Sequence, residues 1–145
     1  MKVDYFNINK PALSTLLDTK RHLSLIDNRL KAIVELRVSQ INGCAYCLNL
    51  HSVEARKLGE SQQRLDCLAA WKESNLFSKK EMAALDWAEK VTNISFFTDL
   101  EACQKTVLHH FSEQELVDLT LVISVMNSLN RLAISFEDSP KKEMQ

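Results

Sequence analysis

The sequence predicts an all-α domain that spans residues 1–145, with about six or seven helices, and three features support this fold class. The chain has only two glycines and two prolines in 145 residues, and so few breakers favour helices over strands joined by tight turns. Apolar residues recur at spacings of three and four, which is the period of an amphipathic helix. Ser-x-x-Glu capping boxes begin at Ser78 and Ser112. A chain of this length can bury one domain core.

The first half of the chain supplies four expected helices. The first begins near Pro11, because proline is well accommodated in the opening turn of a helix. The second covers residues 23–42, where apolar positions follow a helical period, and Gly43 ends it in the left-handed conformation. The third covers residues 44–59, and the fourth follows Ser61 towards Trp71.

The second half supplies three more helices. The capping box at Ser78 opens the first of them, and a short helix is expected over residues 99–108. The capping box at Ser112 opens a long, nearly all-apolar helix that reaches Ala133. A helix that is apolar on most sides lies in the domain centre or between subunits. We therefore expect it to be buried and the protein to be a homo-oligomer.

Charge and composition exclude several classes of protein. The net charge is -1, with 18 basic and 19 acidic residues, so the chain lacks the basic excess of a nucleic-acid-binding protein. We find no apolar segment of a secretory signal at the start and no run approaching the roughly 18 residues of a membrane span. We therefore expect a cytoplasmic address, with no membrane and no nucleic acid as partners.

The pattern most informative about chemistry is Cys44-Ala45-Tyr46-Cys47, with His51 four residues later. Because Gly43 closes the preceding helix, Cys44 falls at a helix start, where free backbone N–H groups and the helix dipole favour a thiolate. Cys47 lies one turn further along, and His51 shares its helical face. We expect the two cysteines to form a reversible disulfide and His51 to exchange protons with them.

Two other interpretations of the cysteine pair are possible. A zinc site would need a third and a fourth ligand, but the sequence has no second CxxC and no HxxxH spacing. The remaining candidate ligands are His51, Cys67, Cys103, His109 and His110. Alternatively, the paired cysteines are inert packed side chains, as we expect of the isolated Cys67 and Cys103. We favour redox chemistry, with no metal and no bound cofactor.

Residues 35–47, which read Glu-Leu-Arg-Val-Ser-Gln-Ile-Asn-Gly-Cys-Ala-Tyr-Cys, resemble the carboxymuconolactone decarboxylase superfamily when taken with His51. Within it, they look most like the alkyl-hydroperoxidase D-like (AhpD-like) members. Further similar segments are residues 70–73, 77–78, 85–89, 91–92, 111–112 and 127–131. The resemblance spans about residues 20–136. It implies an all-α fold, homo-oligomers that are commonly trimers or hexamers, and peroxide reduction by the CxxC pair.

The resemblance also implies a role for each residue of the motif. Cys47 would react with a hydroperoxide substrate, and Cys44 would resolve the resulting sulfenic acid as a disulfide. A thiol or lipoyl-type electron donor would then reduce that disulfide. His51 matches a family histidine that belongs to a proton relay with a glutamate on the preceding helix.

The sequence departs from the family's relay at two positions. The family glutamate falls at Ala32, and Tyr46 occupies a position that is histidine in the best-known members. Glu35 lies one turn after Ala32 on roughly the same face, so it either replaces that glutamate or is a surface ion-pair partner. The candidate catalytic residues are therefore Cys47, Cys44, His51 and Glu35.

We expect from these features a thiol-dependent hydroperoxide reductase that works through a CxxC disulfide cycle in antioxidant defence. The alternative is a redox-sensing or weakly active disulfide-exchange protein that lacks the full proton relay. A lactone decarboxylase is a third possibility, but superfamily members of that kind do not rely on a cysteine pair. The presence of both Cys44 and Cys47 counts against it.

Overall fold

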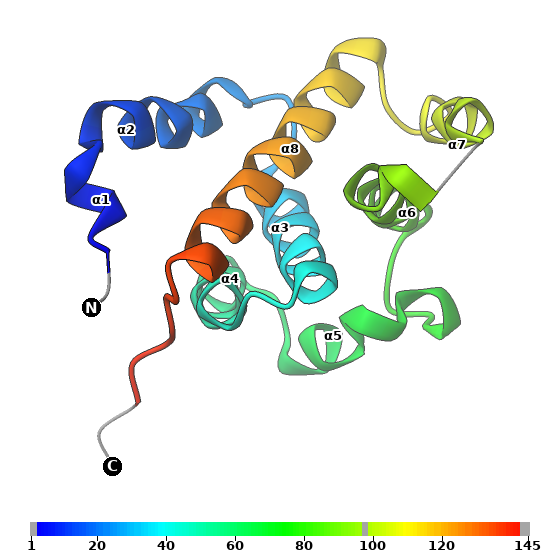
Figure 1. The fold of residues 1–145 in the computed structure, drawn as a ribbon. Helices are drawn as coiled ribbons and strands as arrows, with labels where there is room; N and C mark the ends of the chain where they lie inside the picture. Colours follow the sequence, from blue (N-terminus) through cyan, green and yellow to red (C-terminus); the bar gives the residue numbers. More distant parts are fainter. Residues whose placement is uncertain (1–2, 97–98, 143–145) are drawn as a thin grey trace.

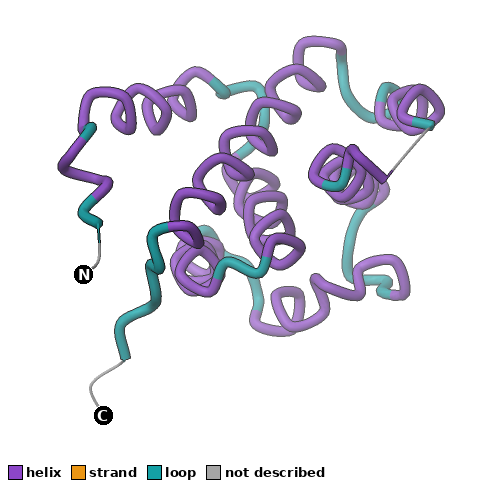
Figure 2. The backbone as a smooth tube through the Cα atoms, viewed as in Figure 1, coloured by secondary structure: helices purple, strands orange, loops and turns teal. Residues whose placement is uncertain are grey.

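The computed structural model describes residues 3–96 and 99–142, which form eight α-helices, three short 3₁₀-helices and no strand (Figures 1 and 2). The α-helices are α1 (Tyr5–Ile8), α2 (Lys10–Asp18), α3 (Asn28–Asn42), α4 (Ala45–Lys57), α5 (Gln62–Cys67), α6 (Lys79–Thr92), α7 (Leu100–Val107) and α8 (Glu113–Ser135). The 3₁₀-helices are η1 (Thr19–His22), η2 (Leu68–Glu73) and η3 (Ile94–Phe96). The all-α prediction is confirmed, and α1 is additional to the seven expected helices.

Helix α8 runs through the centre of the domain. It packs along α3 and α6 and also contacts α4 and η1 (Figure 1). Leu119, Ile123 and Met126 on α8 are almost completely buried, as the apolar pattern predicts. Helix α8 is long and apolar enough, at 23 residues, to cross a membrane by length and composition alone. A core helix passes the same test, and the packing of α8 inside the domain accounts for its composition.

Side-chain caps set most helix starts where the sequence places them. Both capping boxes are present, because Ser78 and Ser112 each accept from a backbone N–H three residues later and the N3 glutamates accept in return. The start of α3 differs from the prediction. Asp27 caps this helix by accepting from the N–H groups of Arg29 and Leu30, so the helix begins at Asn28. The apolar period extends further back because buried residues of the preceding segment continue it.

The fourth expected helix is divided in two. Helix α5 ends at Cys67, and a 3₁₀-helix, η2, continues the chain past Trp71. Within η2, the backbone of Ala70 departs from helical values, with a φ of -113° and a ψ of 31°, so this segment is itself kinked. This kink leaves Trp71 buried, with its indole N–H donating to Glu89 on α6 at 2.8 Å.

The junction between α3 and α4 is held against α8. Gly43 adopts a φ of 69° and closes α3, as predicted. The Asn42 side-chain amide donates to Asn127 and Asn130 on α8 at 2.9 Å each, and Asn130 donates in turn to Ser39 at 3.1 Å. Buried polar groups that are fully hydrogen-bonded rigidify the elements they join. The first residues of α4 therefore occupy a defined position relative to the centre of the domain.

Candidate active site

The two cysteines of the motif lie at the start of α4. Cys44 is the N-cap residue, and its sulfur accepts from the backbone N–H of Cys47 at 3.3 Å. The cysteines form a disulfide with 5.3 Å between their Cα atoms. Both are buried, with exposed fractions of 1% for Cys44 and 4% for Cys47. The disulfide expected from the spacing is therefore present, and its reversibility stays a prediction.

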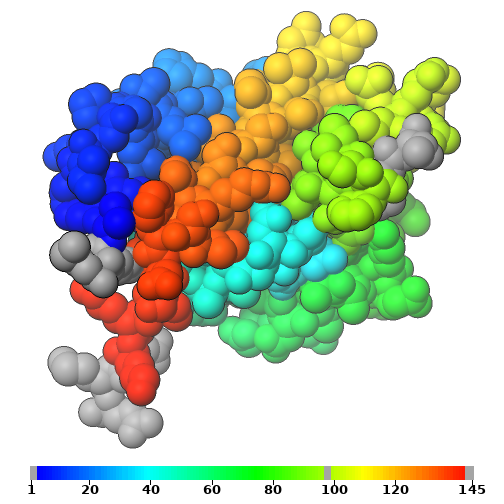
Figure 3. Space-filling view, viewed as in Figure 1, coloured from blue at the N-terminus to red at the C-terminus, as the bar shows by residue number. Residues whose placement is uncertain are grey.

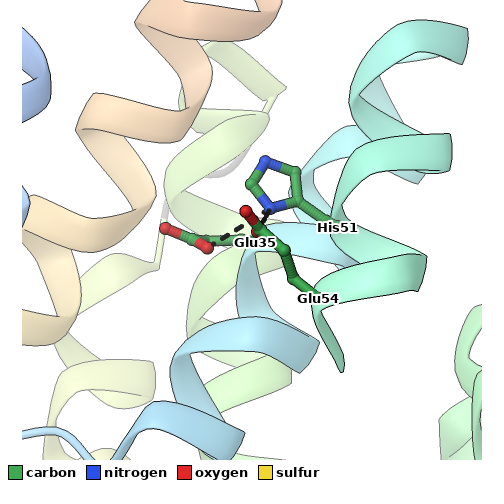
Figure 4. Close-up of side chains that lie close together, drawn as sticks. All are labelled: Glu35, His51 and Glu54. Carbon is green, nitrogen blue, oxygen red and sulfur yellow. Dashed lines mark hydrogen bonds and ion pairs between the residues drawn. The ribbon is translucent and has the colours of Figure 1, made fainter. Parts of the chain in front are cut away.

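His51 is buried on the same face of α4. Its Nδ1 lies 2.8 Å from Glu54 Oε2 and 3.5 Å from Glu35 Oε2 (Figure 4). Within residues 3–96 and 99–142, no hydrogen bond occupies the other ring nitrogen, Nε2. The face that carries Cys47 and His51 continues through buried Ala55, as expected, but Leu58 at the end of the helix is 40% exposed. Leu58 follows the last residue of α4, Lys57, where the helical periodicity ends.

Glu35 reaches the site from α3. Its side chain is buried, and Oε1 lies 2.6 Å from the Lys20 ammonium of η1. The sequence analysis left two roles open for Glu35. It does form an ion pair, with Lys20, but its carboxylate is buried, so the expected surface location is wrong. The structure thus brings Glu35 to His51, and its part in a proton relay stays a prediction. Ala32, one turn earlier on α3, is also buried.

The sequence analysis did not select Glu54. This residue lies three positions after His51 on α4, a spacing at which helical side chains meet. Its side chain is 47% exposed. The hydrogen bond from His51 holds the pKa of the Glu54 carboxyl below its usual range against the opposing effect of burial, and the charges of Lys20 and Lys57 act in the same direction as that bond. The i,i+3 spacing was the available signal, but it is common on helix surfaces.

A cavity of about 290 Å³ opens beside the disulfide. Tyr46, Cys47 and His51 line it from α4, while Cys44 is not among the described residues of its wall. Helices α1 and α2 form the opposite wall, and Met126 and Leu129 of α8 close it further in. The lining is mainly apolar, so the cavity suits a small molecule with an apolar part.

The wall formed by α1 and α2 is fixed to the end of the chain. Tyr5 donates its hydroxyl to Asp138 at 2.7 Å, and its ring stacks on Phe136 with centroids 4.8 Å apart. Burial and the neighbouring Asp138 raise the pKa of Tyr5, so its phenol stays protonated and able to donate at neutral pH. Figure 3 shows the first two helices, in blue, beside the orange and red end of α8.

A second cavity, of about 350 Å³, lies beside Glu35 and Glu54. Ala32, Glu35, Glu54 and Lys57 line it, and Lys20 lines both cavities. Glu54 also borders both, whereas His51 borders only the first and Glu35 only the second. Glu54 is therefore shared by the cavity beside the disulfide and the second cavity.

Glu35, His51 and Glu54 could together hold a metal ion, because their ligand atoms lie within 4.8 Å of one another. However, the lysine on Glu35 and the imidazole hydrogen bond to Glu54 already supply these carboxylates with partners. The isolated cysteines lie outside this group. Cys103 is buried and donates to Asp86 at 3.3 Å; burial and this carboxylate raise the pKa of its thiol. Cys67 is only partly buried, which is less than expected.

The comparisons with known proteins identify the family of this chain and several similar proteins. A model described as the carboxymuconolactone decarboxylase family matches residues 12–90. The uncharacterized protein YdfG of Bacillus subtilis is 36% identical over 136 residues, which is 92% of each chain. A crystal structure of a protein of unknown function from Agrobacterium tumefaciens, provisionally named an antioxidant defence protein AhpD, has a TM-score of 0.92 and 29% identity, covering 98% of this chain and 99% of that chain.

A more distant structure shares the fold. An uncharacterized peroxidase-related protein from Ralstonia eutropha, described as an alkylhydroperoxidase AhpD core, has a TM-score of 0.80 at 20% identity. The alignment covers 94% of this chain and 74% of that chain. Together, the family model and these relatives confirm the resemblance that the motif around the cysteines predicted.

Proposed function

The chain belongs to the carboxymuconolactone decarboxylase family, and on that premise we propose that it is a thiol-dependent hydroperoxide reductase acting in antioxidant defence. One observation carries this proposal. Cys47 and His51 line the same apolar cavity, while the disulfide partner Cys44 is not among the described residues that line it. A substrate in the cavity would therefore meet one sulfur and one proton carrier.

The first step uses Cys47 in its reduced form. Its thiolate attacks the terminal oxygen of the hydroperoxide, because the thiolate is the nucleophilic form of cysteine. The O–O bond breaks, the terminal oxygen stays on sulfur as a sulfenic acid, and the alkoxide leaves. His51, which has taken the thiol proton, returns it to the alkoxide as general acid. Glu35 supports this transfer through its approach to the imidazole.

The second step uses Cys44. Its position as the N-cap of α4 places its sulfur against a backbone N–H, which favours the thiolate. This thiolate attacks the Cys47 sulfur, the S–O bond breaks, and hydroxide leaves as water after taking up a proton. The products are one alcohol, one water and the disulfide. A thiol or lipoyl-type donor then returns two electrons to the pair by thiol–disulfide exchange.

The family and the surface support two further expectations. Val117 and Leu121 on α8 are exposed and line one surface cavity with the exposed Leu108, and exposed apolar residues grouped in this way are typical of interfaces. A homo-oligomer, as a trimer or hexamer, would cover them. A cytoplasmic address is consistent with a disulfide that must be reduced again in each cycle.

The alternative function is redox sensing or slow disulfide exchange by a protein that keeps the fold and the cysteine pair. It would follow if the alanine at position 32 leaves the relay incomplete. Such a protein would cycle its disulfide without sustained consumption of peroxide. Turnover therefore separates the two functions.

The test is steady-state consumption of cumene hydroperoxide with dihydrolipoamide as the donor. We expect catalytic turnover by the wild type and none by Cys47→Ser. In the absence of the donor, Cys44→Ser should consume at most one equivalent of peroxide, because its sulfenic acid cannot be resolved within the chain. Cys67→Ser serves as the matched control and should behave as wild type. The proposal fails if the wild type consumes peroxide no faster than the donor alone. A disulfide that still forms and is reduced would then favour redox sensing.

A further inference from the structure

The imidazole of His51 faces two carboxylates, and the geometry ranks them. We propose that Glu54, rather than Glu35, is the main positioning residue of His51, holding the ring proton on Nδ1 so that Nε2 serves as the base for Cys47. This assignment rests on the function proposed above. It adds to that site a residue from the same helix as His51.

Distance is the first argument. A ring N–H makes one good hydrogen bond, and N–H···O bonds have donor–acceptor distances of about 2.7–3.2 Å. The Nδ1 to Glu54 Oε2 distance of 2.8 Å lies within this range, whereas the 3.5 Å to Glu35 Oε2 lies beyond it. Glu54 therefore accepts the hydrogen bond from the Nδ1–H group, and Glu35 contributes only its nearby charge.

Charge pairing is the second argument. Glu35 has a lysine partner, because the Lys20 ammonium lies 2.6 Å from its Oε1. Glu54 has no lysine or arginine within ion-pair distance among the described residues, and His51 is its only ion-pair partner there. An imidazolium at this position would thus be stabilised chiefly by Glu54, because Lys20 contacts Glu35 directly, whereas Lys20 and Lys57 act on Glu54 only from beyond ion-pair distance.

Access is the third argument. Glu54 borders both cavities and its side chain is 47% exposed, so a proton can pass between His51 and solvent along its carboxylate. Of the two cavities, Glu35 borders only the second, and its side chain is buried. A carboxylate that both orients a histidine and reaches solvent can fix the tautomer and exchange protons.

The first test measures the tautomer of His51 in the reduced protein, using the ¹⁵N chemical shifts of the imidazole. In Glu54→Ala the acceptor is lost, so we expect the proton to shift from Nδ1 towards Nε2. Glu54→Gln keeps an acceptor oxygen without the charge and should restore most of the wild-type tautomer. The proposal is overturned if Glu54→Ala leaves the tautomer unchanged. Circular dichroism checks the fold, which the replacement of a half-exposed side chain should preserve.

The second test measures the reactivity of Cys47 with iodoacetamide across pH, with the site of alkylation resolved by peptide mass spectrometry. The other groups that face His51 or its cavity are Lys20, Glu35, Tyr5, Tyr46 and the reduced cysteines. Glu54→Gln should slow alkylation at neutral pH by about tenfold, the lower end of the effect seen when the carboxylate partner of a metal-bound histidine is removed. Glu35→Gln should have a smaller effect in the same direction.

The matched control is Glu101→Gln on α7. This removes an exposed carboxylate on α7 whose ion-pair partner among the described residues is Lys105, so alkylation of Cys47 should not change. A larger effect for Glu35→Gln than for Glu54→Gln would contradict the proposal. Neither test uses a peroxide. The role of Glu54 can therefore fail while peroxide turnover is observed, or hold while turnover is absent.

Discussion

Two ionic clusters begin on α3, at the buried Glu35 and at Arg37 two residues later, and they differ in how completely their charges are paired. The site cluster consists of Lys20, Glu35, His51 and Glu54. The α6 cluster consists of Arg37, Trp71, Lys72 and Glu89. Glu35 points towards η1 and α4, whereas Arg37 points towards α6.

The α6 cluster is saturated. One oxygen of Glu89 accepts from Arg37 Nε at 3.0 Å, from Arg37 Nη2 at 2.9 Å and from Trp71 Nε1 at 2.8 Å. Lys72 lies 2.9 Å from the other oxygen. Burial alone would raise the pKa of Glu89, but these hydrogen bonds lower it. Such a cluster holds α3, η2 and α6 together, and the hydrogen bonds to Glu89 keep its carboxylate ionised at neutral pH.

The site cluster is balanced differently. Two carboxylates have one lysine and one imidazole as partners, so their balance depends on whether the imidazole carries a proton. Histidine is the side chain that changes charge most readily near neutral pH. A cavity borders each side of the cluster. The comparison suggests that full pairing serves the fold, and that incomplete pairing beside a cavity serves proton transfer.

The largest expected effect within these clusters is that of His51→Ala. If His51 is the base, its loss removes general-base assistance that is typically worth about 10²–10⁴-fold. The pH at which half of the reduced Cys47 is alkylated should rise, and peroxide reaction should slow, while the helical circular dichroism spectrum persists. An unchanged alkylation profile would remove His51 from the mechanism, and the proposed roles of Glu35 and Glu54 with it.

Glu89→Gln should lower the free energy of unfolding without changing the reactivity of Cys47. It leaves the Arg37 guanidinium without its carboxylate in a largely buried setting, at a cost of about 2 kcal/mol of unfolding free energy. Because the folded state lowers the pKa of Glu89, its contribution is present above the ordinary carboxyl pKa of about 4.3. It is lost as the pH falls through the folded-state value. Urea unfolding at pH 7 and pH 3 measures this difference, which should shrink at pH 3. A changed alkylation rate of Cys47 in this variant would break the contrast between the clusters.

The smallest effects should come from the two lysines. Lys72 is 57% exposed, so Lys72→Met should change the unfolding free energy by less than about 1 kcal/mol. Lys20→Met leaves Glu35 without its cation and makes the site more negative, which disfavours the Cys47 thiolate. The alkylation midpoint should therefore rise slightly in Lys20→Met and stay constant in Lys72→Met. Equal profiles for the two variants would show that the Lys20 charge does not reach Cys47.

Much of the fold could be predicted because its signals are local. The capping boxes at Ser78 and Ser112 and the left-handed Gly43 each depend on residues within one turn. The boundary of α3 could not be placed, since Leu23 and Ile26 are buried without being helical. Hydrophobic periodicity reports burial, and a buried loop beside a helix can continue the same period.

The sequence by itself determined the cysteine pair at a helix start and the position of His51 on the face of Cys47. These relations follow from helical geometry, which fixes neighbours three and four residues apart. Only the tertiary structure decided which charges meet the imidazole. Lys20 and Glu35 come from η1 and α3, and their approach depends on packing between elements. Glu54 was within local reach, but two carboxylates competed for one N–H, and the side-chain positions that ranked them are set by the surrounding packing rather than by sequence spacing.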